Sequence, residues 1–118
     1  MKKRKPRLIR EEGKVRLELV PHSALTEEAK ALDHGNAKEG RTAYNWRRDR
    51  VRLRDQIGGA LRHINRFLDG QDVDPKSLAH ELGHARARLG IVIDAQKSGL
   101  LVDDRLPLKP RTSRARQS

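Results

Sequence analysis

The sequence predicts an all-α protein: a small helical bundle of three main helices with an extended N-terminal segment and disordered basic tails. Apolar residues recur at helical spacing in three separate segments, and Gly or Pro stands near the ends of each. Aromatic residues are scarce, with one Trp, one Tyr and one Phe. A core built from Leu, Ile, Val and Ala suits packed helices, and a chain of 118 residues is the size of one domain.

The first helix is predicted over residues 24–34, with Ser23 as its N-cap and Gly35 as its stop. The preceding stretch, "GKVRLELVP", alternates apolar and charged side chains as far as Pro21. This alternation predicts either a short strand or an extended segment laid across the helices.

The second helix is predicted over residues 50–69, after a long loop over "GNAKEGRTAYNW" that has no helical period. Its apolar stripe runs from Leu53 to Leu68, and Gly70 ends it. Gly58 and Gly59 inside it cost about 1 kcal/mol each relative to Ala. They indicate a close helix contact or a ligand near the backbone.

The third helix is predicted over residues 75–98, because Asp74 is a good N-cap and Pro75 a favoured first residue. Gly99 follows its end, and "LLV" then forms a short apolar anchor. These boundaries predict three regions: a basic flexible arm over 1–10, a single all-α domain over 11–107, and a basic flexible tail over 108–118.

The net charge of +11 is located at the two ends of the chain. Residues 1–10 hold six Lys or Arg and residues 105–118 hold five, and neither stretch contains an acidic residue. The rest of the chain is neutral overall. The tails could attract nucleic acid or nucleotide phosphates, or they could be solvated ends. A non-catalytic basic nucleic-acid-binding protein is therefore one hypothesis for the function.

Several classes of protein are not expected. The chain has no Cys, which excludes disulfides, thiolate metal sites and a cysteine nucleophile. No apolar run approaches about 18 residues, so no segment should span a membrane. The basic N-terminus lacks the apolar stretch of a secretory signal. A cytoplasmic location is the resulting prediction.

The segment "HELGH", with His80, Glu81 and His84, matches the H-E-x-x-H pattern of zinc peptidases. On a helix the two histidines would lie one turn apart on one face, as two ligands of one metal require. A zinc peptidase also needs a third protein ligand downstream and an edge strand that binds the substrate. No Glu or His follows His84. A zinc metalloprotease is thus a less favoured hypothesis.

Other residues could join these side chains at a central metal site, as in other helical bundles. His63 lies on the second predicted helix, Asp72 and Asp74 precede the third, and Glu28 lies on the first. Each also has an ordinary structural explanation, such as the capping of a helix by Asp74. Their combination favours a metal–nucleotide site.

Five ordered pieces of the sequence resemble the phage-associated dATP/dGTP diphosphohydrolase domain family, which is grouped with the MazG-like nucleotide pyrophosphohydrolases. The pieces are "GKVRLELVP", "HGNAKEG…NW", "ALRHINRFLDGQDVDPKS", "HELGHARARLGIVIDA" and "GLLVDDRLP". They span about residues 13–107. The resemblance implies an all-α enzyme that hydrolyses purine deoxynucleoside triphosphates to the monophosphate and pyrophosphate. It would act in phage nucleotide metabolism, in the host cytoplasm if a phage encodes it.

The resemblance also implies a divalent metal ion: Mg²⁺, Mn²⁺ or another transition metal. The MazG-like relatives hold Mg²⁺ with paired acids, whereas histidine ligands here suit transition metals better. The candidate metal ligands are Glu28, His63, His80 and His84. The candidate acids and bases of catalysis are Glu81, Asp72 and Asp74. The candidate substrate-binding residues are Lys14, Arg16, Lys38 and Arg62 for the phosphates and Asn45 and Trp46 for the purine. A homo-oligomer is expected because the core is small.

Overall fold

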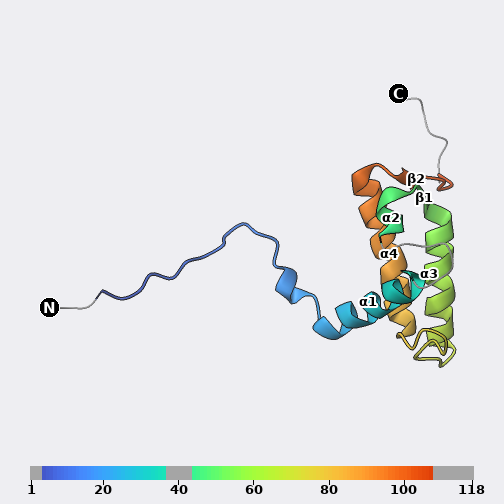
Figure 1. Cartoon of the computed structure of the whole chain (residues 1–118), viewed down its shortest axis with the longest axis horizontal. Coiled ribbons are helices and arrows are strands. Elements are labelled where there is room, and N and C mark those ends of the chain that lie inside the picture. The colour runs from blue at the N-terminus through green and yellow to red at the C-terminus, as the bar shows by residue number, and fades with distance from the viewer. Residues whose placement is uncertain (1–3, 37–43, 108–118) are drawn as a thin grey trace, which may run out of the picture.

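The computed structural model describes residues 4–36 and 44–107, and over these residues the chain is a small all-α bundle, as predicted. Its three long helices are α1 (His22–Asn36), α3 (Leu53–Leu68) and α4 (Glu81–Ser98). A short helix, α2 (Asn45–Arg48), precedes α3. In Figure 1, α3 and α4 run side by side while α1 crosses the end of the pair, and α4 packs against both other long helices.

The core of the bundle is made mainly of small residues. Most of its buried apolar side chains are alanines, and the largest fully buried side chain is that of Glu81. Gly83 lets α1 approach α4 closely, because a Cβ at this position would lie 2.7 Å from backbone atoms of Glu27. Small side chains therefore bring the helix backbones together and leave a carboxylate between them.

A short parallel strand pairing joins the N-terminal end of α3 to the C-terminal end of α4. Strand β1 (Val51–Arg52) pairs with β2 (Leu101–Val102), and the backbone N–H of Arg54 donates to Asp104 Oδ1 at 2.9 Å. The predicted apolar anchor after Gly99 is thus confirmed. Among the described residues, no helix is both long enough and apolar enough to cross a membrane.

The segment before α1 differs from the prediction. It contains one 3-10 turn, η1 (Leu17–Leu19), and its side chains are exposed instead of lying across the helices. Figure 1 shows it running away from the bundle. The first helix also starts earlier than predicted: Pro21 O accepts from the N–H groups of Ala24 and Leu25, so Ser23 lies inside the helix and is not its N-cap.

The prediction of a helix from residue 75 is wrong, because α4 begins at Glu81. Asp74 does accept from the backbone N–H groups of Lys76 and Ser77, but it caps only a turn. Leu78 then adopts φ 62, a left-handed conformation that a bulky residue rarely takes and that ends the turn. The helix restarts with His80 as N-cap. Three parts of the predictions lie outside the described residues: the phosphate-binding role of Lys38, residues 1–3 of the arm, and the tail over 108–118.

Candidate functional site

Glu81 occupies the centre of the site, at the first residue of α4. Its side chain is 0% exposed. Oε1 lies 2.7 Å from Nδ1 of His63 on α3, and Oε2 accepts from the side-chain amide of Gln71. Among the described residues no Lys or Arg forms an ion pair with it. A fully buried carboxylate with an imidazole and an amide as partners, and without a Lys or Arg, is a candidate ligand for a metal ion.

A second imidazole, that of His84, lies next to His63. Their rings stack with centroids 4.4 Å apart and an interplanar angle of 8°. His84 Nε2 lies 2.6 Å from Oγ of Ser77, and the ring of His34 meets it edge-on at 6.3 Å. Burial lowers the pKa of His84, and the charge of His63 lowers it further. At neutral pH His84 is therefore an uncharged ring against its neighbour.

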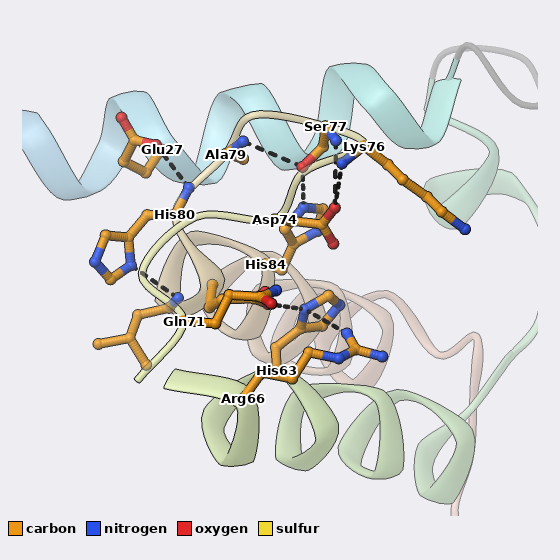
Figure 2. A network of polar contacts seen from close by, with 12 residues as sticks. Glu27, His63, Arg66, Gln71, Asp74, Lys76, Ser77, Ala79, His80 and His84 are labelled. Carbon is orange, nitrogen blue, oxygen red and sulfur yellow. Dashed lines mark hydrogen bonds and ion pairs between the residues drawn. The ribbon is translucent and has the colours of Figure 1, made fainter. Parts of the chain in front are cut away.

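Asp74 faces this network from the turn that precedes α4 (Figure 2). Its Oδ1 accepts from the backbone N–H of Lys76 at 2.8 Å and of Ser77 at 3.4 Å. Burial would raise the pKa of Asp74, but these amides, together with His84 and His63, outweigh it and the pKa is lowered. The carboxylate is therefore ionised at neutral pH and can act as a ligand or a base.

His63, Asp74 and Glu81 form a group that can hold a metal ion. One ligand atom from each lies within 4.8 Å of the others. An imidazole nitrogen with two carboxylate oxygens is a donor set that suits Mn²⁺, Zn²⁺ and similar ions. We call these three residues the metal-ligand group. They come from α3, the turn and α4, so only the folded chain brings them together.

The metal-ligand group adjoins a pocket of about 490 Å³ that both His63 and Asp74 line. Three of the predicted substrate-binding residues, Asn45, Trp46 and Arg62, line the same pocket. Trp46 is half-buried, with Tyr44 edge-on at 5.8 Å and the guanidinium of Arg47 5.4 Å from its ring centre. A volume of this size is typical of sites for small organic ligands.

His80 does not join the metal-ligand group, contrary to its prediction as a ligand. It precedes α4 as N-cap, and its Nδ1 accepts from the backbone N–H of Leu82 at 3.0 Å. Its ring packs against Phe67 with centroids 5.2 Å apart. His80 and His84 are therefore not the pair on one helix face that a zinc peptidase requires, and this removes the basis of the protease hypothesis.

Glu28 and Asp72 are also apart from the metal-ligand group. Glu28 pairs with Arg86 at 3.2 Å on the side of α4 that faces α1. Asp72 is exposed, and its contact with Glu81 is through the backbone: the carbonyl of Asp72 accepts from the N–H of Glu81. Sequence spacing placed these acids near the site, but the direction of each side chain depends on helix rotation and turn geometry.

Lys14 and Arg16 are not brought to the pocket either. Both lie in the exposed segment before α1, and the guanidinium of Arg16 pairs with Glu18 at 3.0 Å. The segment carries no contact that would hold these cations near the metal-ligand group.

The sequence reasoning missed Gln71, Ser77 and His34. Gln71 and Ser77 belong to the turn "DGQDVDPKS", where only the aspartates had a recognisable role. No spacing signal distinguishes a glutamine that holds a buried carboxylate from one that faces water. The sequence showed a histidine, His34, near the end of the first predicted helix. It did not indicate that this helix crosses the pocket.

Comparison with known proteins identifies the family. The sequence model of the family described as "dATP/dGTP diphosphohydrolase, N-terminal" matches residues 4–105. No curated protein and no solved structure matches the chain. The family description indicates a hydrolase at the level of the family. Because the match covers most of the 118 residues, the chain belongs to the dATP/dGTP diphosphohydrolase N-terminal family.

Proposed function

We propose that this protein hydrolyses dATP and dGTP to the monophosphate and pyrophosphate, with a divalent metal ion held by His63, Asp74 and Glu81. The observation that carries the proposal is the position of this metal-ligand group beside a pocket of about 490 Å³. The same pocket offers an aromatic ring, an amide and cations, the groups that a purine and a polyphosphate need.

A bound divalent cation would lower the pKa of a water molecule and neutralise charge on the phosphates. The chain supplies the arrangement around it. Gln71 and His63 hold the two oxygens of Glu81 in fixed directions. The backbone amides occupy Oδ1 of Asp74, which leaves Oδ2 to bind the metal or to accept a proton from the attacking water.

The substrate would lie along the pocket from the metal-ligand group toward α2. Arg62, Asn45 and Trp46 line this pocket. In the proposal Arg62 binds phosphate oxygens, while Asn45 and Trp46 meet the base by hydrogen bonding and stacking. Arg47 anchors α2 to α4 through two hydrogen bonds to Asp94, the shorter at 2.6 Å. This anchor keeps the indole of Trp46 at the pocket wall.

Self-association belongs to the same proposal, with a second copy of this chain as the partner. The buried core consists mainly of alanines, while Leu61 and Leu68 on α3 are exposed. With Ile57 and Ile64 they form a stripe at helical spacing that a second copy could cover. A mass of one chain in light scattering at micromolar concentration would contradict this part of the proposal.

A hydrolysis screen tests the catalytic proposal directly. The protein is incubated with each of the four deoxynucleoside triphosphates and with Mg²⁺ or Mn²⁺, and the nucleotide products and pyrophosphate are measured. We expect dATP and dGTP to yield the monophosphate and pyrophosphate. Glu81→Gln should remove this activity, while the matched control Glu28→Gln, which removes the same charge on α1, should keep it.

Two outcomes would refute the proposal. One is the absence of turnover with every nucleotide and metal. The other is equal activity in Glu81→Gln and wild type, since a neutral amide at a buried ligand position cannot replace the carboxylate.

A further inference from the structure

Two cations that the sequence reasoning did not select, Arg66 and Lys76, line the same pocket as Arg62. Within residues 4–36 and 44–107, no carboxylate forms an ion pair with any of the three. All three residues are exposed to solvent at the pocket. Three cations that have no acidic partner within the described part of the chain thus line one cavity.

Three other arginines of the bundle are held by partners within the chain. Arg86 pairs with Glu28, and Arg47 pairs with Asp94. Arg88, which also lines the pocket, donates to Oε1 of Gln56 at 3.2 Å and has its guanidinium over Gly59. Arg47 and Arg86 thus have carboxylate partners, whereas no ion pair joins Arg62, Arg66 or Lys76 to an acid among the described residues.

The three cations line the pocket together with His63 and Asp74 of the metal-ligand group. Arg66 follows Arg62 by one helical turn, and its Nη1 lies 3.4 Å from Nδ1 of His63. Lys76 comes from the turn, where its backbone N–H donates to Asp74. Two like charges one turn apart repel in the absence of a ligand, so an anion bound between them relieves an unfavourable contact. Figure 2 shows Arg66 beside His63 and the Lys76 side chain extending from the turn that holds Asp74.

We propose that Arg66 and Lys76, together with Arg62, form a polyphosphate subsite that holds the substrate's phosphates from both sides of the metal-ligand group. The inference deepens the proposed function and rests on it. A guanidinium can bind two phosphate oxygens at once, whereas an ammonium acts as a point charge. Arg66 would therefore orient the phosphate chain, and Lys76 would add charge on the opposite side.

Binding of inorganic tripolyphosphate in the presence of EDTA tests the subsite without requiring catalysis. Titration calorimetry on the wild type should show binding. Arg66→Gln and Lys76→Gln should each raise the Kd about tenfold, as expected for one lost charge-assisted contact. Lys97→Gln is the matched control, because it removes one positive charge from the exposed C-terminal end of α4. It should leave the Kd within about twofold of wild type.

A second measurement, the KM for dGTP, uses the same variants. Arg66→Gln and Lys76→Gln should raise KM, and Arg66→Lys should restore part of the loss because it keeps the charge but not the planar fork. Circular dichroism and thermal melting check that the variants fold, which their exposed positions favour.

The outcomes separate this inference from the proposed function. Tripolyphosphate binding that depends on Arg66 and Lys76, without hydrolysis of any nucleotide, would leave the subsite standing and refute the function. Hydrolysis with an unchanged KM in both variants would overturn the subsite and keep the function. Absence of tripolyphosphate binding by the wild type at millimolar concentration would also overturn the subsite.

Discussion

The carboxylates on the two sides of α4 have different kinds of partner. Toward α1, Glu28 meets the guanidinium of Arg86 at a half-exposed position, as in an ordinary surface ion pair. Toward α3, Glu81 is fully buried, and among the described residues its carboxylate bonds to an imidazole and an amide. The first arrangement neutralises the carboxylate within the chain. The second holds the carboxylate without a Lys or Arg partner among the described residues, beside a pocket lined by Arg62, Arg66 and Lys76.

This difference teaches how to separate structural acids from reactive ones in a chain where 36% of the residues are charged. An exposed ion pair contributes little free energy and does no chemistry. A buried carboxylate is costly unless a partner compensates it, which is why the proposed function assigns Glu81 to a metal ion. Each prediction below tests whether the two sides of α4 really differ in this way.

The largest expected effect is on metal binding. His63→Ala should weaken Mn²⁺ binding and reduce kcat/KM for dGTP by at least about a hundredfold, because it removes a proposed ligand and the contact that orients Glu81. His80→Asn is the control, since Asn is also a strong N-cap and can still accept from the N–H of Leu82. Titration calorimetry with Mn²⁺ measures both. Equal losses in the two variants would contradict the assignment of His63 and the exclusion of His80.

A large effect on stability is expected where α1 crosses the N-terminal end of α4. Gly83→Ala should lower the free energy of unfolding by about 1–3 kcal/mol, because its Cβ would lie 2.7 Å from backbone atoms of Glu27. Gly90→Ala on the same helix should cost less, since its Cβ would meet only the flexible end of Glu28 at 3.1 Å. Urea unfolding at one pH compares them. A greater loss for Gly90→Ala would contradict the close backbone approach at Gly83.

A smaller effect is expected in the pH dependence of the metal-free protein. Burial, followed by the charge of His63, lowers the pKa of His84 in the folded state. The unfolded chain binds this proton near the ordinary value of 6.5. Between the folded and unfolded pKa values the unfolded state holds more protons, so acidification favours unfolding.

The urea midpoint of the wild type should therefore fall as the pH is lowered from 7.5 to 5.5, measured with EDTA present. His84→Gln should show a weaker fall over the same interval. Parallel curves for the two proteins would contradict the lowered pKa.

The smallest effect is expected for Glu28, which forms an ion pair with Arg86 on the side of α4 that faces α1. Glu28→Gln should change the free energy of unfolding by less than about 1 kcal/mol, as is usual for half-exposed pairs. Metal affinity should be that of wild type. Thermal melting and Mn²⁺ titration measure both quantities, and a loss of metal affinity would place Glu28 in the site after all.

The sequence by itself determined the helical class, the approximate position of the three long helices and the family. These depend on local periodicity, on Gly and Pro at helix ends and on ordered motifs, all of which are written along the chain. It also selected His63, Asp74 and Glu81 as candidates, because residue type and position along the predicted helices and turn can be read from the sequence.

Only the tertiary structure decided which candidates meet. His80 is a cap because the turn ends at the left-handed Leu78 and α4 begins at Glu81. His84 is a stacked ring because α4 packs beside His63 of α3. Glu28 faces Arg86 because of how α1 and α4 pack, and Gln71 faces Glu81 because of the path of the turn between α3 and α4. Side-chain direction depends on contacts between segments far apart in sequence, and local patterns carry no information about those contacts.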